Sequence, residues 1–570
     1  MTWISELCLA VKSPETAARY RNAAIGILFV PLTQLLVVPI LTSLGSHGIT
    51  LPASVLVMLM VTLIMLVANL ASRGVSNFYI QYMKGPTDFL GRHMAFGFVP
   101  PFVMLSKDHL NTAADIPRIA GAFVVTTLIS YVGCYLFATG SFKLESRIRG
   151  LESKVGDVES QTEQTTVLSS KVSSAKRVSQ MSQLTIRMVN NESLSSIDTF
   201  SSPPAGMDFL VRTSPLWISL TLLLTVGLPI YCATGYDMPF EAFLFVFLWI
   251  GTILFQRSLR TLKTLAPYPR LKYSLVVVCN PVLIVAALGT AYFWIKAAAN
   301  HQSIEAVLDN FKRHDDWAQI VAHLAQDHDP RQHIGAADLA TALLDAGIVS
   351  LGLKMFEYRA ALWRSFATVL STSLAAAVAS VFLNVALARA VGLAAAEALA
   401  FAARNVTIAL GAPAVLHLGG STTLMSALVI FSGMIFQMTG DLLFAWVAIP
   451  DQRPTGVASG IQYAPRGGGV VTEKNSGNNN AAMMTTSDSD AEDGKKEDDD
   501  AIGQHGAECK IIAAGVTVGI NAAAMGTTHL LERDSMATAY SALSMIMFGC
   551  ITVGLTSIPT VAQALKALAA

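Results

Sequence analysis

The chain has 570 residues, of which 53% are hydrophobic and 14% are charged, and its formal net charge at pH 7 is zero. Because soluble domains carry about 25% charged residues, this composition excludes an ordinary soluble domain and indicates a membrane protein. The balanced charge predicts no nucleic-acid partner.

Apolar runs along the chain predict the fold class. Runs near the roughly 20 residues that span a bilayer are 23–44, 51–71, 119–140, 215–234, 239–256, 273–295, 365–387, 424–448 and 536–563. Shorter or interrupted runs are 93–106, 337–353, 393–415 and 511–531. We therefore expect an all-α, multi-pass integral membrane protein, in contact with the lipid bilayer, with about 12 membrane segments, several of them discontinuous.

The polar stretch that follows the run 119–140 separates two membrane modules. Residues 1–140 form a predicted four-span module, and residues 141–206 form a polar, partly helical linker. Apolar residues with 4-3-4-3 spacing open this linker: Leu144, Ile148, Leu151, Val155 and Val158. So short a heptad pattern is marginal by itself, which favours a helical extension of the fourth span; self-association into a homo-oligomer is the alternative.

The second membrane module is interrupted by an acidic insert. Its first part is predicted over 207–450 and its last part over 510–570, with the insert at 451–509. The insert contains the stretch SDSDAEDGKKEDDD. Since low hydrophobicity and clustered charge cannot offset the entropy of ordering, we predict that the insert is disordered.

The sequence carries no pattern typical of a catalytic, metal or cofactor site. Its six cysteines are scattered without a CxxC pair, and the histidines of 301–335 fit no standard ligand spacing. No HExxH or GxSxG motif falls in a plausible context. We therefore expect no enzyme, no metal and no cofactor.

The stretch FAARNVTIALGAPAVLHLGGSTT, residues 401–423, places polar residues and helix breakers within apolar sequence. A charged side chain at the bilayer centre costs ~3 kcal/mol on insertion scales, so Arg404 indicates function or pairing. We predict that Gly411 and Pro413 interrupt a helix there. Broken backbone inside a membrane requires protein or a watery cavity to satisfy its polar groups.

Two further stretches resemble this one in composition. They are 515–532, which holds Asn521 and a Gly-Thr-Thr-His sequence, and 335–358, which is divided by glycines. Because paired, interrupted segments are typical of transporter sites, we predict that 335–358, 404–415 and 516–530 are discontinuous and meet near mid-bilayer. In the alternative, Arg404 reaches the interface or pairs with a membrane acid such as Asp338, Asp345 or Glu397.

Broken-helix ends offer free N–H groups and a positive dipole end to an anion. Hydroxyl and amide side chains near such ends can donate hydrogen bonds to carboxylate oxygens. We therefore predict a site for a small anionic solute. Its expected residues are Arg404, Asn405, Thr407, Asn521, Gly526, Thr527 and Thr528, with Asn280 close by.

The back half resembles the LrgB membrane family. The residues that carry the resemblance are Arg404-Asn405-Val406-Thr407-Ile408-Ala409, the stretch from Gly519 to His529, and Asn280-Pro281 followed by VLIVAAL. The sequence departs from the family pattern where Ile408-Ala409 replaces a Thr-Pro and Ala522-Ala523 replaces a Ser-His.

The front half resembles the LrgA family in LPASVLVMLM at 51–60 and FLGRHMAFGFVPPFVML at 89–105. The two modules in one chain are similar to plastidial glycolate/glycerate translocators. The resemblance implies either a carrier of small monocarboxylates such as glycolate, glycerate and pyruvate, or a holin-like modulator of permeability or cell-wall hydrolases. The broken segments and the membrane arginine favour the carrier, because a pore needs neither.

Overall fold

The computed structural model describes residues 14–46, 53–72, 74–105, 115–163, 205–262, 264, 267–313, 320, 334–447, 490–532 and 536–570. The chain divides into two compact units. One consists of residues 1–19 and 143–214, and the other of residues 20–142 and 215–570. The second unit therefore combines the first predicted membrane module with the second, and it contains the site described below.

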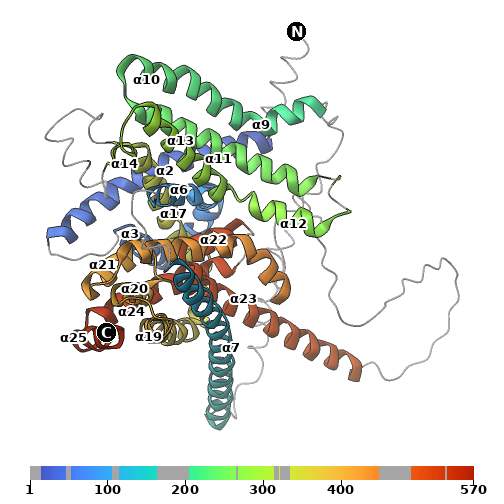
Figure 1. The fold of residues 1–570 in the computed structure, drawn as a ribbon. Helices are drawn as coiled ribbons and strands as arrows, with labels where there is room; N and C mark the ends of the chain where they lie inside the picture. The colour runs from blue at the N-terminus through green and yellow to red at the C-terminus, as the bar shows by residue number, and fades with distance from the viewer. Residues whose placement is uncertain are drawn as a thin grey trace, which may run out of the picture. The chain divides into compact units, whose positions relative to one another are not determined.

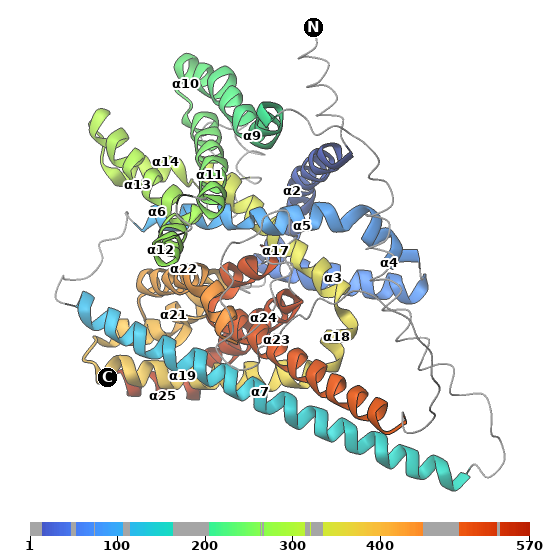
Figure 2. The same ribbon diagram turned by 90° about the vertical axis from the view of Figure 1, so that its right-hand side faces the viewer.

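Eleven helical stretches of the described residues are long and apolar enough to cross a membrane. They lie in α2 (Pro14–Ser46), α3 (Ala53–Ala71), α7 (Ile116–Glu163), α11 (Asp237–Thr261), α13 (Pro281–Ala299), α17 (Ala336–Glu357), α19 (Phe366–Ala390), α22 (Thr422–Val447), α23 (Asp490–Glu532), α24 (Ala537–Ser557), and the run α9 (Ala205–Leu222), η3 (Leu223–Gly227) and α10 (Leu228–Thr234). Figures 1 and 2 show these helices. They confirm the predicted all-α, multi-pass membrane fold.

Shorter helices connect or interrupt the long ones. Between Gly74 and Met104 the chain forms α4 (Gly74–Phe78), η1 (Tyr79–Met83), α5 (Lys84–His93), η2 (Met94–Phe98) and α6 (Val99–Met104). The others are α12 (Pro269–Val278), α14 (Ile304–Phe311), α18 (Arg359–Arg364), α20 (Ala395–Ala400), η5 (Phe401–Ala403), α21 (Ile408–Leu418) and α25 (Pro559–Ala569). The run 93–106 is thus divided at Val99, immediately before Pro100-Pro101, which have no N–H to continue a ladder.

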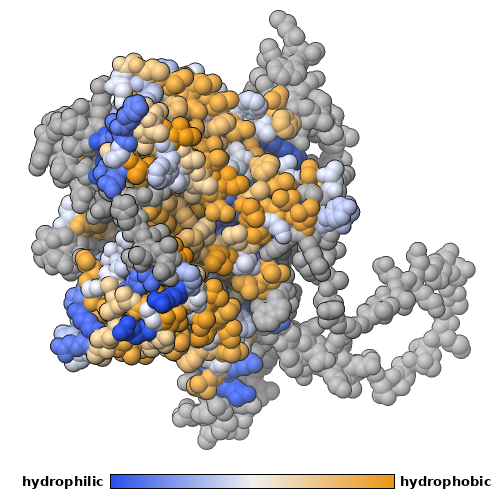
Figure 3. All heavy atoms as spheres, viewed as in Figure 1, coloured by the Kyte–Doolittle hydropathy of each residue, from blue (hydrophilic) through white to orange (hydrophobic). Residues whose placement is uncertain are grey.

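The described surface carries the apolar side chains that a bilayer requires. Figure 3 shows apolar residues over much of the visible face. On α7, every fourth residue of one stripe is an exposed aliphatic: Val124, Leu128, Val132 and Leu136. Since such a stripe is unfavourable in water, these helices lie in contact with lipid.

Two of the three segments predicted to be discontinuous are broken, and the third is not. The backbone forms a turn at 404–407, between η5 and α21. Helix α21 (Ile408–Leu418) runs through Gly411 and Pro413, so the interruption predicted at these two residues is wrong. Within α23, Ala523 has a non-helical φ of 46° and ψ of −136°. In contrast, α17 is continuous from Ala336 to Glu357, so the prediction for 335–358 is wrong.

The glycines of α17 serve close packing instead of interruption. A Cβ at Gly347 would overlap the side chain of Met94, and one at Gly352 would approach the Thr62 hydroxyl to 2.9 Å. Asp338, predicted to lie in a broken segment, accepts a hydrogen bond from the Gly335 N–H at 2.8 Å and caps the helix. Gly347 and Gly352 thus allow η2 and α3 to approach α17.

Two helices run beyond their apolar segments. Helix α7 continues to Glu163, into the stretch predicted to be a polar, partly helical linker. Helix α23 begins at Asp490, within the stretch for which disorder is predicted, while 451–489 lie outside the described residues. Once a helix has formed over the apolar part of α23, each further residue adds one hydrogen bond, and this favours extension into polar sequence.

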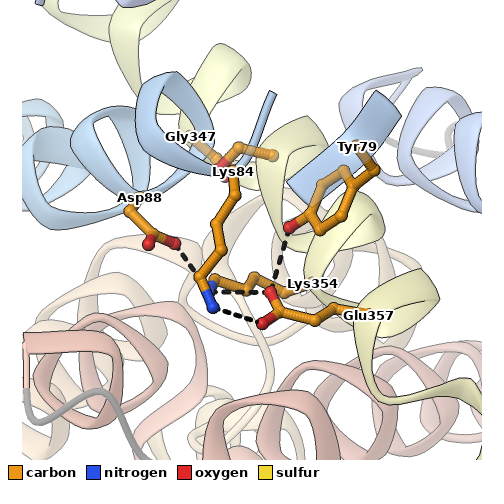
Figure 4. A network of polar contacts seen from close by, with 7 residues as sticks. Tyr79, Lys84, Asp88, Gly347, Lys354 and Glu357 are labelled. Atoms are coloured by element: carbon orange, nitrogen blue, oxygen red, sulfur yellow. Dashed lines mark hydrogen bonds and ion pairs between the residues drawn. The ribbon is translucent and has the colours of Figure 1, made fainter. Parts of the chain in front are cut away.

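A partly buried ion-pair network joins α5 to the end of α17 (Figure 4). The Lys354 Nζ lies 2.6 Å from an oxygen of Asp88 and 3.0 Å from one of Glu357. Lys84 contacts the other Glu357 oxygen at 2.7 Å, and the Tyr79 hydroxyl donates to Glu357 at 3.0 Å. Burial lowers the pKa of Lys84, but its hydrogen bond to Glu357 and the negative charges of Glu357 and Asp88 together outweigh burial and raise the Lys84 pKa above its ordinary value.

Gly519 allows α23 and α24 to pack at close range. A Cβ there would overlap the Ser541 carbonyl oxygen and the Ser544 hydroxyl, whereas a Cβ at Gly554 of α24 would meet nothing within 4 Å. We expect Gly519→Ala to destabilise the protein by ~1–3 kcal/mol, as overpacking does. Gly554→Ala should be neutral or slightly stabilising, since alanine is the better helix former. Thermal unfolding in detergent measures both changes, and equal midpoints for the two variants would contradict this account of the packing.

Candidate functional site

The break between α20 and α21 presents the arginine. Helix α20 is capped by Glu397, whose carboxylate accepts from the Ala394 N–H at 3.1 Å. After the single turn of η5, the chain forms a turn in which the Val406 N–H donates to Ala403 at 3.0 Å. Helix α21 begins after Thr407. Arg404 and Asn405 therefore project from irregular backbone between two short helices.

Arg404 is completely buried and only partly hydrogen-bonded. Its Nη1 donates to the hydroxyl of Thr127 on α7 at 2.9 Å, and its Cζ lies 5.8 Å from the centre of the Phe123 ring. Its Nε and Nη2 are buried and have no hydrogen-bond partner among the described residues. These two atoms form one edge of the guanidinium, which can bind two oxygens of one carboxylate.

Among the residues that the structure describes, Arg404 is not paired with a membrane acid. Within the described part of the chain, Arg404 forms no ion pair with an acidic side chain. Asp338 and Glu397 each accept from a backbone N–H at the start of their own helices. Asp345 accepts a hydrogen bond from Gln34 at 3.2 Å. None of the three acids named as alternatives forms an ion pair with Arg404.

Asn405 and Asn521 join the two backbone breaks. Asn405 Nδ2 donates to Asn521 Oδ1 at 3.1 Å and to Ser130 Oγ at 3.2 Å. Asn521 lies two residues before the break at Ala523, and its Nδ2 donates to the Thr517 carbonyl at 2.9 Å. The two amides are 2% and 1% exposed, so their hydrogen bonds form away from solvent. They hold the 404–407 turn against the first part of α23.

The other predicted site residues lie in two further settings. Thr407 is the N-cap residue of α21, and its hydroxyl is buried without a partner among the described residues. Thr527 and Thr528 donate to carbonyl oxygens four residues earlier in α23, at Ala523 and Ala524. A Cβ at Gly526 would overlap with Ala522 and Val518 side-chain atoms, so this glycine serves packing.

Asn280 is connected to α23 through one intermediate residue. Its side chain caps α13 by accepting from the Val282 N–H at 2.9 Å, and it donates to Gln437 at 3.4 Å. Gln437 in turn donates to the Met525 carbonyl at 3.4 Å, just after the break at Ala523. The structure thus brings Arg404, Asn405 and Asn521 together, whereas Asn280 contacts the second part of α23 through Gln437.

Sequence reasoning missed the contribution of α7. Thr127, Ser130, Tyr131 and Cys134 follow i, i+3, i+4, i+7 spacing and lie on one helical face. Thr127 and Ser130 contact Arg404 and Asn405, and Tyr131 stacks on Phe436 with ring centres 6.2 Å apart. The signal available in the sequence was this polar stripe within an apolar span.

A cavity of about 270 Å³ is lined by residues of α7 and α19. Its polar lining comes from Ser130 and Cys134 of α7 and from Thr372, Ser380 and Asn384 of α19. Ser130 is shared between this cavity and the hydrogen bond to Asn405. The cavity therefore adjoins the cluster of Arg404, Asn405 and Asn521 through Ser130, although none of these three residues lines it, and its volume is slightly below the range of about 300–1,000 Å³ typical of small-molecule sites.

The fold and this cluster define a multi-pass, all-α membrane protein with a buried arginine at a helix break. Residues 270–486 and 508–562 match the family model of the LrgB-like family. The match includes all eight predicted site residues and leaves out α7. The front-half resemblance to LrgA and the similarity to plastidial translocators remain predictions. No curated protein and no solved structure matches this chain.

Proposed function

We propose that this protein is a membrane carrier for small monocarboxylates of the glycolate, glycerate or pyruvate type. The observation that supports this proposal most directly is the unpartnered Nε–Nη2 edge of Arg404. The remaining contacts of the guanidinium, to Thr127 and to the face of Phe123, hold its plane without neutralising its charge. An anion with two oxygens in one plane is the ligand that such an edge recognises.

The energetics of a buried charge support the same ligand. Removing a guanidinium from water is costly unless an opposite charge and hydrogen bonds compensate it. No acidic side chain compensates Arg404 among the described residues. A bound carboxylate supplies both the charge and two acceptors. The broken backbone at 404–407 leaves backbone N–H and C=O groups free that a continuous helix would pair internally.

The rival function is a holin-like change of membrane permeability. Uptake of labelled two- and three-carbon acids into proteoliposomes, with a larger dye trapped inside, separates the two functions. For a carrier we expect uptake that saturates and is competed by unlabelled acid, while the dye is retained. Non-saturable uptake together with dye release supports the holin-like function, and absence of any acid uptake contradicts the carrier.

A further inference from the structure

We infer that Asn405 makes the site selective for 2-hydroxy acids over 2-oxo acids of the same carbon skeleton. This inference rests on the proposed function, because it concerns the ligand of the same site. It depends on the direction in which the Asn405 amide points. The two ends of an asparagine amide have opposite hydrogen-bonding character, so their assignment decides what a ligand meets.

The hydrogen-bond network determines this direction from a backbone carbonyl. The Thr517 carbonyl oxygen can only accept, and it lies 2.9 Å from Asn521 Nδ2, so the amide nitrogen of Asn521 must face it. Asn521 therefore presents its oxygen to Asn405, and Asn405 must donate to it from its amide nitrogen, 3.1 Å away. The second hydrogen on this nitrogen faces the Ser130 hydroxyl at 3.2 Å.

The amide oxygen of Asn405 is the polar atom of this side chain that is left to bind a ligand. Both hydrogens of Nδ2 are engaged, and Oδ1 is buried without a hydrogen-bond partner among the described residues. An amide oxygen accepts and cannot donate. Nearby hydroxyls, such as that of Thr407, can do either and do not discriminate. Asn405 Oδ1 is thus the group that distinguishes a donor on the ligand from an acceptor.

In our proposal, one short acid bridges the acceptor of Asn405 and the donor edge of Arg404. The two residues are consecutive, and their side chains are anchored to Thr127 and Ser130, three residues apart on α7. Three residues correspond to about 4.5 Å along a helix axis. A two- or three-carbon acid can therefore place its carboxylate on Arg404 and its neighbouring substituent at Asn405.

The chemistry of that substituent then decides affinity. A 2-hydroxyl group donates its hydrogen to Asn405 Oδ1, and this satisfies a buried acceptor. A 2-oxo group brings a second acceptor toward the first, so both remain without a donor and away from water. Sites that hold a buried polar group reject ligands that cannot pair with it.

Lactate and pyruvate test this inference, because they share carbon skeleton, size and charge. Their inhibition constants are measured against saturable uptake of one labelled acid by the full-length protein in proteoliposomes. We expect lactate to bind about 10-fold more tightly than pyruvate, or better, as for a missing hydrogen bond to a buried group. In Asn405→Leu, which removes the acceptor at similar size, the two constants should become nearly equal.

Thr126→Val is the matched control. Thr126 is a buried threonine next to Thr127, but its hydroxyl bonds only to carbonyl oxygens of its own helix, Ala122 at 2.7 Å and Phe123 at 3.2 Å. The lactate preference should survive this change. Equal constants for lactate and pyruvate in the unaltered protein overturn the inference and leave the carrier intact. A preference that persists in Asn405→Leu overturns the role of Asn405, and absence of uptake of any acid overturns the proposed function itself.

Discussion

Arg404→Ala is expected to abolish saturable uptake of monocarboxylates, and Arg404→Lys to reduce it by about 10-fold or more. Alanine removes both the buried charge and the unpartnered Nε–Nη2 edge. Lysine retains the charge, but its ammonium cannot present two parallel donors to a carboxylate. Initial rates of labelled-acid uptake into proteoliposomes, normalised to the amount of inserted protein, measure both effects.

Arg359→Lys is the matched control for this substitution. Arg359 also stacks on a phenylalanine, with its Cζ 4.5 Å from the centre of the Phe356 ring, and it donates to the Phe356 carbonyl at 3.0 Å. It lies in α18, at the other end of α17 from the Asp338 cap and outside the Arg404 cluster. Uptake should therefore be unchanged. Normal abundance and unchanged uptake in Arg404→Ala would show that the carboxylate site lies elsewhere.

The fold was predictable because it follows from local apolar runs. Long apolar stretches and the cost of a membrane arginine are properties of short windows, so the helices and Arg404 were identified from them. The glycines of α17 were interpreted wrongly, because Gly347 fits equally a helix break or a close packing contact. Only the position of Met94, from a distant part of the sequence, decides between these roles.

The part of the site that was not predicted from the sequence depends on tertiary contacts. Thr126 and Thr127 are neighbours of one type, yet Thr126 bonds to its own helix and Thr127 holds Arg404. No local rule distinguishes them, since hydroxyls in membrane helices commonly bond to their own backbone. The kink at Ala523 is similar: an alanine with a φ of 46° has no marker in the sequence, and the surrounding packing must impose it.

Lys354→Met is expected to destabilise the protein by ~3–5 kcal/mol, the range observed when one partner of a buried ion pair is removed. The Lys354 side chain is 2% exposed and bridges Asp88 and Glu357. Without it, Glu357 keeps Lys84 and Tyr79, but Asp88 loses the cation that compensates it. The contact between α5 and α17 should therefore weaken, and the thermal unfolding midpoint in detergent should fall.

Lys84 provides an internal comparison, because it contacts the same glutamate from a more exposed position. Its side chain is 37% exposed, and water can solvate the charges that its loss leaves behind. We therefore expect Lys84→Met to cost at most about 1 kcal/mol, as exposed pairs do. Equal destabilisation by the two lysine variants would contradict the idea that burial makes Lys354 contribute more to stability than Lys84.

Restoring the charge balance should restore part of the stability. In the double variant Lys354→Met with Asp88→Leu, the remaining Lys84–Glu357 pair is neutral overall, and no buried carboxylate is left without a cation. Apolar replacements of a buried pair are often neutral or even stabilising, so the double variant should unfold at a higher temperature than Lys354→Met alone. If the second substitution instead adds to the loss, then Asp88 stabilises the α5–α17 contact by packing, independently of its charge.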